Sequence, residues 1–284
     1  MDTCYSTQDS LICLRGEAPR QPEPAYLRGG IPDTYRCTTG GWYSSGGDHM
    51  SRVFEVPISH GASARIGISE PELRALGLNL TTWTSSFVLA SQLHKLDVHP
   101  ARSSALPVLE LGAGTGLVGL TAATLWRVPV VLTDLSPIVP GLAGNIKLNS
   151  SLVKDLVQCG SLDWTVPDLL ELQSGKIYTA QKDKASVILA ADVIYCEEHP
   201  ELLAKTIFRW LADGPASRVV IAWPLRVAYL DHLREMWELL ETGGLEAIEE
   251  GREQASTEDW DDECLIEFSV WRWKLSNGAR ASSY

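Results

Sequence analysis

A short apolar segment that runs directly into alternating glycines places the strongest constraint on this fold. Val108–Leu111 has the character of a buried strand, and Gly112, Gly114 and Gly116 follow it at every second position. Glycine has no Cβ, so the backbone of such a turn can pass close to a ligand. The apolar residues that follow Gly116 have helical character. A strand, a glycine turn and a helix in this order are typical of the first unit of an α/β sheet.

Strands and helices alternate through the rest of the chain. Short apolar segments predict five parallel strands, helical segments separate most of them, and two final strands can pair antiparallel around an acidic loop at 251–263. We therefore expect an α/β, Rossmann-like, seven-stranded and mostly parallel sheet with helices on both faces. The expected strands are 108–111, 128–133, 156–159, 186–191, 218–223, 245–248 and 264–273. The expected helices are 85–96, 117–126, 136–149, 200–211 and 227–240, with Ser136 and Pro137 at the start of the third.

The first fifty residues differ in composition from the rest of the chain. They hold seven glycines and four prolines but few aliphatic residues. Such a segment buries too little apolar surface to offset its ordering entropy. We expect a loosely ordered extension over 1–50, which Trp42 and Tyr43 could attach in part, and one domain over 51–284. Alternating apolar residues at about 53–68 predict a β-hairpin at the start of that domain.

Charge and cysteine usage disfavour several classes of protein. The formal net charge of −12 argues against direct nucleic-acid binding, which needs a basic surface, and leaves open a basic protein substrate. The six cysteines form no C-x-x-C pair and have no histidine cluster at zinc spacing, so we expect reduced thiols and no metal. The N-terminus lacks an apolar signal core, and the most apolar stretch, 117–132, contains Arg127 and Pro129. We expect a cytoplasmic protein with no membrane span.

Ligands of an open parallel sheet bind at the carboxyl ends of its strands. Glu110, just before the glycine turn, would repel a pyrophosphate but attract an ammonium or a sulfonium group. Leu117 stands where a dinucleotide fingerprint has its third glycine. Asp134 ends the second strand, 20 residues after Gly114. A carboxylate at this position can accept hydrogen bonds from both hydroxyls of a ribose. These residues favour S-adenosyl-L-methionine over a nicotinamide dinucleotide. A packing turn without a ligand and a helix cap at Asp134 are the structural alternatives.

Two motifs carry a resemblance to a known family. The glycine-turn segment 109–120 and the Asp192-Val193-Ile194-Tyr195 motif after the fourth strand resemble family 16 of the seven-β-strand protein methyltransferases, many of which methylate lysine side chains. The resemblance covers about 53–275 and implies S-adenosyl-L-methionine as cofactor and a protein as substrate. For the tryptophans, core packing is the plain alternative. The resemblance places Trp83, Gly112, Ala113, Gly114, Asp134, Trp164 and Ala191 against the cofactor, together with Glu110, and places Asp192 and Tyr195 on the substrate side.

Methyl transfer to lysine needs a neutral amine, whereas a lysine with its ordinary pKa of about 10.4 is protonated at neutral pH. Desolvation and a nearby sulfonium both favour the neutral amine. Asp192 would favour the cation, so we expect it to capture and orient the lysine. Tyr195 can line the channel and face the cationic head. No dedicated general base is evident, so most of the rate would come from proximity and alignment.

A narrower resemblance concerns 70–86, which is similar to the fungal branch that modifies translation elongation factors, especially elongation factor 2. We therefore expect a monomeric protein-lysine N-methyltransferase that acts on such a factor. The alternatives are a non-catalytic adaptor that keeps the cofactor pocket, a methyltransferase for another protein residue or a small molecule, and a nucleotide-cofactor oxidoreductase.

Overall fold

The computed structural model describes residues 40–43, 51–70, 72–73, 78–79, 81–256 and 265–275. Within these ranges the largest sheet has nine strands in the order β10-β9-β8-β7-β6-β11-β12-β14-β13. The predicted α/β fold with a mostly parallel sheet is confirmed, and all seven predicted strands belong to this sheet. They are β6 (Leu106–Leu111), β7 (Val130–Asp134), β8 (Val157–Ser161), β11 (Ala185–Ala191), β12 (Arg218–Pro224), β13 (Leu245–Gln254) and β14 (Leu265–Trp273).

The strands β6 and β11 are neighbours at the centre of the sheet, and every residue in them is buried. A strand that is covered on both faces needs a continuous apolar run, which both segments supply almost throughout. β6 also pairs in parallel with β7, and β11 with β12. β14 runs antiparallel to β12 and to β13, so the predicted pairing of the last two strands is confirmed. β13 continues into the predicted acidic loop as far as Gln254, and 257–263 of that loop lie outside the described residues.

Two short strands that the sequence does not predict extend the sheet beyond β8. β9 (Leu169–Leu172) pairs antiparallel with β8, and β10 (Ile177–Thr179) pairs antiparallel with β9. Each is four residues long or less, which is too short for an alternating pattern to stand out. The hairpin they form adds an edge to the sheet beside the strand that precedes Trp164.

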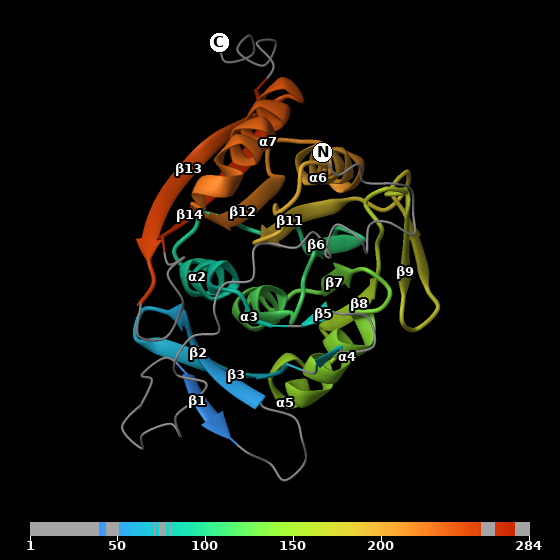
Figure 1. Ribbon diagram of the computed structural model, residues 1–284. Coiled ribbons are helices and arrows are strands. Elements are labelled where there is room, and N and C mark those ends of the chain that lie inside the picture. The colour runs from blue at the N-terminus through green and yellow to red at the C-terminus, as the bar shows by residue number, and fades with distance from the viewer. Residues whose placement is uncertain are drawn as a thin grey trace, which may run out of the picture.

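Helices cover both faces of the sheet, as predicted (Figure 1). Apolar side chains of the sheet form two cores, one on each face, and each core includes residues of the helices on that face. The helices of the first face are α2 (Thr84–Gln92), α3 (Leu117–Trp126), α4 (Val139–Leu148) and α5 (Ser150–Val153). Those of the second face are α6 (His199–Trp210) and α7 (Leu230–Thr242), which the short 3-10 helix η3 (Val227–Tyr229) precedes.

The predicted start of α4 was wrong. Ser136 and Pro137 form a turn before the helix, in which the Ile138 N–H donates to the Leu135 carbonyl at 2.9 Å. The first helical residue is Val139, and Pro140 occupies the first turn, where a missing N–H costs nothing. Two prolines three residues apart both suit a helix start, and the sequence pattern alone does not separate them.

The predicted N-terminal β-hairpin is present as β2 (Ser51–Ser59) and β3 (Ala62–Ser69), and β1 (Gly40–Tyr43) pairs with β2. Its buried residues Phe54, Ile66 and Ile68 belong to the same core as α2, α3 and α4. Figure 1 shows the hairpin on the outer side of these helices. The predicted extension over 1–50 otherwise lies outside the described residues. A second small pair, β4 (Glu72–Leu73) and β5 (Leu78–Asn79), precedes α2.

Asn145 of α4 links the hairpin to the glycine turn, and Asn149, which directly follows α4, makes a second contact with the hairpin. The Asn145 amide accepts from the Ser69 N–H at 2.8 Å and donates to the Thr115 carbonyl at 2.9 Å. One helical turn later, the Asn149 amide accepts from the Gly67 N–H at 3.0 Å and donates to the Gly67 carbonyl at 2.7 Å. Side chains four residues apart share one helix face, so both reach the same strand. The hairpin thus braces the loop that follows β6.

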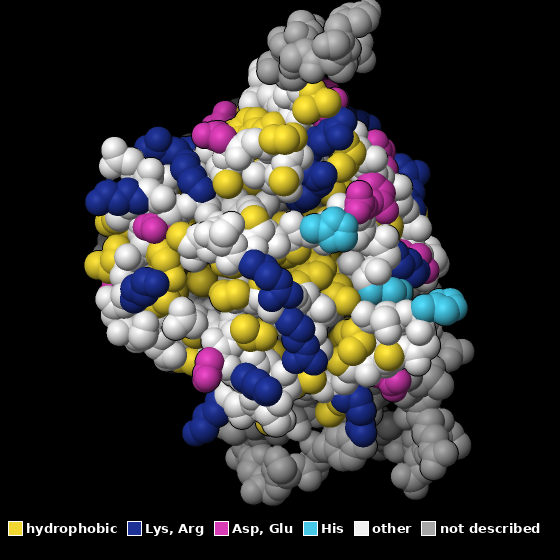
Figure 2. Space-filling view, turned by 180° about the vertical axis from the view of Figure 1, so that it is seen from behind, with side chains coloured by type: hydrophobic (Ala, Val, Ile, Leu, Met, Phe, Trp, Pro, Cys, Tyr) yellow, Lys and Arg dark blue, Asp and Glu magenta, His cyan; other side chains and the backbone are white. Residues whose placement is uncertain are grey.

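Among the described residues, no helix combines the length and apolar character needed to cross a membrane. The same part of the chain contains no group of three or more histidine, cysteine or acidic side chains placed to hold a metal ion. On the face seen in Figure 2, lysine and arginine side chains lie in several groups among apolar and uncharged side chains.

Candidate active site

The glycine turn after β6 has the left-handed backbone that its sequence suggests. Gly112, Gly114 and Gly116 have φ angles of +63°, +54° and +85°, a region that residues with a Cβ rarely adopt. The Ala113 N–H donates to the Thr133 carbonyl at 2.9 Å, which ties the turn to β7. A Cβ on Gly114 would meet no atom within 4 Å in the described part of the chain, its chain neighbours aside. The turn therefore presents its backbone to open space at this glycine.

Asp134 ends β7 and binds the same turn. Its Oδ2 accepts the Gly114 N–H at 2.8 Å, and its Oδ1 accepts the Leu135 N–H at 2.7 Å. Burial of the carboxyl raises its pKa to about 6, although both backbone hydrogen bonds act in the opposite direction. Each carboxylate oxygen retains a second lone pair. Asp134 can therefore orient the glycine turn and still accept hydrogen bonds from two ribose hydroxyls.

Glu110 lies inside the sheet, with 2% of its surface exposed. Its Oε2 accepts the Gly119 N–H at 2.9 Å, so the side chain fastens β6 to the start of α3. Burial, and to a smaller extent the negative charge of Asp134, raise the pKa of this carboxyl to about 8, although the hydrogen bond from Gly119 acts in the opposite direction. The carboxyl is mostly protonated at pH 7 in the ligand-free chain, and a cation nearby would favour its ionised form. The predicted attraction of Glu110 for an ammonium group stays a prediction.

The two predicted tryptophans differ in how they lie relative to the glycine turn. A Cβ on Gly112 would lie 3.3 Å from the Trp164 ring, so this ring packs directly on the turn. Trp83 precedes α2 and is 47% exposed. Its neighbour Thr82 contacts the Thr115 hydroxyl at 2.9 Å, which joins the start of α2 to the turn. Trp83 is therefore not a core residue, and a large aromatic surface remains available beside the turn.

Asp192 follows the last residue of β11, Ala191, on the strand next to β6. Its φ angle is +57°, the left-handed region, which is uncommon for a residue with a Cβ. The backbone holds this conformation through a 2.9 Å hydrogen bond from the Asp192 N–H to the Ala222 carbonyl of β12. Its side chain is 3% exposed. Backbone outliers of this kind gather at functional sites, where the surrounding structure enforces them.

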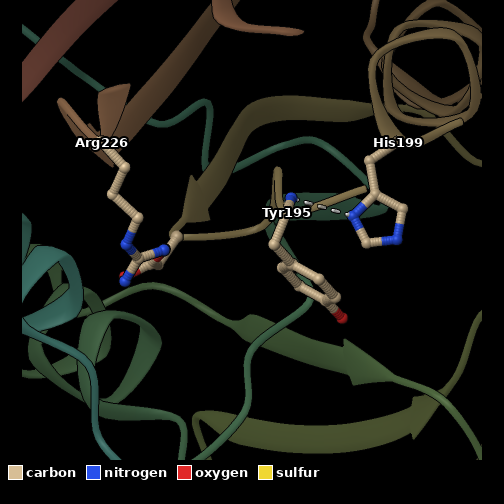
Figure 3. Close-up of polar contacts among 4 residues, drawn as sticks. Tyr195, His199 and Arg226 are labelled. Carbon is tan, nitrogen blue, oxygen red and sulfur yellow. Dashed lines mark hydrogen bonds and ion pairs between the residues drawn. The ribbon is translucent and has the colours of Figure 1, made fainter. Parts of the chain in front are cut away.

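Arg226 contacts Asp192, a relationship that sequence reasoning missed. Its Nη1 lies 2.8 Å from Asp192 Oδ1, and its Nη2 lies 3.4 Å from Oδ2. The guanidinium carbon lies 5.7 Å from the centre of the Trp83 ring. Figure 3 shows Arg226 reaching to the end of β11. The two residues lie 34 positions apart, and no spacing rule links residues on loops after different strands.

Tyr195 and His199 form a second unit at the same strand end. Their rings make an edge contact with centres 4.3 Å apart, and the Tyr195 N–H donates to His199 Nδ1 at 3.4 Å (Figure 3). The His199 ring also contacts the Trp164 ring at 5.8 Å. Burial lowers the pKa of His199 and raises that of the Tyr195 hydroxyl, which the charges of Asp134 and Asp192 raise further. Both rings are therefore uncharged at neutral pH.

The structure thus brings the predicted site residues together at the carboxyl ends of the central parallel strands. The turn after β6, Asp134 after β7 and Asp192 after β11 lie on adjacent parallel strands. Trp164 joins them through its contact with the turn, and Trp83 through its contact with Arg226. His199 is a site residue that the sequence analysis missed. Its position four residues after Tyr195 was the available signal.

Comparison with known proteins agrees with this arrangement. The model of the lysine methyltransferase family matches residues 62–232. The chain is 34% identical over 226 residues to protein-lysine N-methyltransferase EFM2 of Saccharomyces cerevisiae. The aligned region covers 74% of this chain and 51% of EFM2. It is 34% identical over 230 residues to protein-lysine N-methyltransferase rrg1 of Schizosaccharomyces pombe, covering 79% of this chain and 71% of that protein. It is 32% identical to protein N-lysine methyltransferase METTL21A of Danio rerio, and the aligned region covers 63% of this chain and 74% of that protein.

This chain belongs to the lysine methyltransferase family, as its sequence motifs predict. It spans about half the length of EFM2. The family implies S-adenosyl-L-methionine as the cofactor, and the site fits that molecule. Gly114 offers backbone with room beside it, Asp134 has acceptor capacity for a ribose, and Trp83 and Trp164 supply flat apolar surface.

Proposed function

We propose that this protein is an S-adenosyl-L-methionine-dependent protein-lysine N-methyltransferase. The observation that carries the proposal is the adjacency of two motifs. Ala190 of β11 is the register partner of Leu111 of β6, so the glycine turn and the Asp192–Tyr195 motif leave neighbouring strands side by side. A cofactor held by the first motif would present its reactive end near the second. This arrangement supports an enzyme over a protein that only retains a cofactor pocket.

When bound, S-adenosyl-L-methionine supplies an electrophilic methyl group on its sulfonium. Asp134, Gly112, Ala113 and Gly114 hold the cofactor in this proposal, with Trp164 covering it. Asp192, paired with Arg226, orients the lysine side chain in this proposal. The Tyr195 ring faces the cationic head of the lysine, a contact of about 0.5–2 kcal/mol. In the in-line displacement that this arrangement would permit, the bond from the methyl group to sulfur would break as its bond to the neutral lysine nitrogen forms, with S-adenosyl-L-homocysteine as the leaving group. The proton that the lysine ammonium must first lose would pass to solvent. Alignment supplies most of the rate.

We further propose that the substrate is a translation elongation factor, with elongation factor 2 as the first candidate, and that the enzyme works as a monomer in the cytoplasm. The segment 70–86 suggested this branch, and two of its described residues contact each other next to the site. Glu70 Oε1 accepts the Thr82 N–H at 2.8 Å, directly before Trp83. The similarity to EFM2 supports the same branch.

The test is transfer of radiolabelled methyl groups to protein. The purified chain is incubated with labelled S-adenosyl-L-methionine and a lysate of cells that lack it, and in parallel with purified elongation factor 2. The expected result is one labelled protein whose lysine methylation is located by mass spectrometry. Asp192→Asn is expected to bind the cofactor normally in calorimetry and to lose most transfer. Label that enters only small molecules or other residue types contradicts the proposed substrate class. Cofactor binding without any transfer would indicate an adaptor.

A further inference from the structure

Arg226 connects three elements at the substrate side of the site. It follows β12 and precedes η3, its guanidinium binds the carboxylate that ends β11, and it lies over the Trp83 ring at the start of α2. Its backbone is anchored by a 2.9 Å hydrogen bond from its N–H to the Pro224 carbonyl. The side chains of Arg226 and Asp192 are 14% and 3% exposed. The pair is therefore largely removed from water.

A buried ion pair of this kind is weak evidence for stability, because the loss of hydration offsets much of the attraction between the charges. Its position suggests another role. The proposed reaction needs a lysine amine without its extra proton, and a lone carboxylate within 4–6 Å of that amine would favour the protonated form. A guanidinium on the carboxylate cancels this effect. It also adds a positive charge that disfavours an ammonium beside it.

Arginine is suited to this task in a way that lysine is not. Its pKa exceeds about 12, so it stays charged throughout the range in which a lysine substrate titrates. Its planar fork matches both carboxylate oxygens, and both Arg226 nitrogens engage Asp192. The guanidinium also lies over the Trp83 ring, a cation–π contact that adds to the two contacts with Asp192. The charge is therefore held at one place relative to the end of β11.

Other titratable groups surround the pair. The charge of Asp134 on β7 acts on Tyr195, as that of Asp192 does. Cys196 follows Tyr195 on the same loop, and Glu198 and His199 stand at the start of α6. His232 of α7 interacts with His199. Burial raises the pKa of the Cys196 thiol to about 11 and lowers that of His199, so neither carries charge near pH 8. A lysine that enters beside Tyr195 therefore meets the charges of Asp134 and of the Asp192–Arg226 pair, and a substitution at Arg226 changes only the second of these.

We propose that Arg226 is a positioning residue that neutralises Asp192, so that the incoming lysine meets an ion pair instead of a bare carboxylate and loses its proton more readily. This inference rests on the proposed function, because it takes a lysine side chain as the occupant of the site. It assigns a role in substrate deprotonation to a residue outside the Asp192–Tyr195 motif.

The test is the pH dependence of kcat between pH 7 and 10 at saturating cofactor and substrate, because kcat reports the ionisation of the bound lysine. The substrate is the protein that the wild-type enzyme labels. Arg226→Gln leaves Asp192 without its cation, so the midpoint of the profile is expected to move up by at least about one pH unit. Arg226→Lys keeps a positive charge and is expected to hold the wild-type midpoint at a lower rate. Asp192→Asn leaves the arginine uncompensated and is expected to move the midpoint down.

The double variant Asp192→Asn with Arg226→Gln restores a neutral pair of similar volume. Its midpoint is expected to return to the wild-type value while its rate stays low, which a merely structural role would not produce. The control is Arg272→Gln, since Arg272 pairs with Glu246 at 2.8 Å at the opposite end of β14. That variant is expected to keep the wild-type profile. Equal midpoints in Arg226→Gln and the wild type, or equal shifts in the glutamine and lysine variants, would overturn the proposal.

A second measurement does not depend on turnover. Carbon-13 NMR of aspartate-labelled protein follows the Asp192 carboxyl, whose signal is identified by its loss in Asp192→Asn. Its titration midpoint is expected to be higher in Arg226→Gln than in the wild type, and an unchanged midpoint would overturn the neutralising role. If the wild-type chain methylates no protein while the NMR shift is present, the proposed function fails and the charge pairing stands.

Discussion

The Asp134 carboxylate holds the Gly114 N–H at 2.8 Å, so the acid that ends β7 fixes the backbone of the glycine turn after β6. This contact links the two features that most strongly predict the cofactor. One oxygen serves the turn, the other serves Leu135, and both keep a lone pair that points elsewhere. The glycine turn is therefore ordered before a ligand binds. Binding of the ligand then does not carry the entropic cost of ordering this loop.

Asp134→Asn is expected to weaken binding of S-adenosyl-L-methionine by at least about tenfold. A hydrogen bond to a charged acceptor contributes roughly 1.5–3 kcal/mol, and 1.4 kcal/mol corresponds to one decade in affinity. Isothermal titration calorimetry measures the change. The matched control is Asp183→Asn, because Asp183 also accepts a backbone N–H, that of Thr179 at 2.8 Å, in the turn before β11. If both variants bind S-adenosyl-L-methionine with the affinity of the wild type, Asp134 does not contact the cofactor.

Gly114→Ala is expected to abolish cofactor binding at a modest cost in stability. Both Gly114 and Gly175 have a positive φ, +54° and +83°, and among the residues that the structure describes, no atom outside the chain neighbours would lie within 4 Å of a Cβ on either. Each alanine variant should lose about 1–2 kcal/mol of unfolding free energy through backbone strain. Only the Gly114 variant places a methyl group where the ligand passes. Urea unfolding and calorimetry on the two variants separate strain from obstruction, and retained binding in Gly114→Ala would contradict this placement.

The framework of the fold was predictable because its signals are local. A strand buried on both faces needs an unbroken apolar segment, and 106–111 and 185–191 supply one apart from single polar residues. The positions of Asp134 and Asp192 followed from the rule that ligands meet the carboxyl ends of such strands. β9 and β10 escaped prediction because their patterns span four residues or fewer.

The parts of the site that the sequence did not predict depend on contacts between distant loops. The Arg226–Asp192 pair forms because the loop after β12 folds back over the end of β11, and periodicity carries no information about that path. The left-handed backbone of Asp192 is likewise invisible in the sequence, since Asp gives no signal comparable to glycine. The burial of Glu110 was missed for a different reason. The strand that contains Glu110 was predicted to be buried. The hydrogen-bond partner of the Glu110 side chain, the Gly119 N–H, lies beyond the glycine turn, and the sequence did not indicate this contact.

Tyr195→Phe is expected to retain methyl transfer within a few-fold of the wild type, whereas Tyr195→Ala loses about 2- to 30-fold. Burial and two nearby carboxylates raise the pKa of the hydroxyl above its ordinary value, so it cannot act as a base at neutral pH. The phenylalanine ring keeps the edge contact with His199. Steady-state kinetics with the labelled protein measure both variants. A large loss in Tyr195→Phe would show that the hydroxyl itself takes part.

Glu110 makes the stability of the ligand-free chain depend on pH. Its pKa is about 8 in the folded chain against 4.5 as its ordinary value, so between these values the folded state keeps a proton that the unfolded state has released. Unfolding free energy therefore falls as pH rises from about 4.5 to 8, by a few kcal/mol in total. Asp134 contributes in the same direction, but only from about 3.8 to 6.

Glu110→Gln removes the larger of these two contributions. The glutamine can still accept the Gly119 N–H, so the packing of β6 on α3 is preserved. Urea unfolding at pH 6 and pH 8 should show the wild type losing stability over this interval. The variant should lose much less, because Asp134 is already half ionised at pH 6 and only the end of its titration falls in the interval. Glu171→Gln, on the exposed face of β9, is the control and should keep the wild-type slope. If Glu110→Gln keeps that slope too, the buried carboxyl is ionised in the folded chain, and the charge that Glu110 offers a cationic ligand is present before binding.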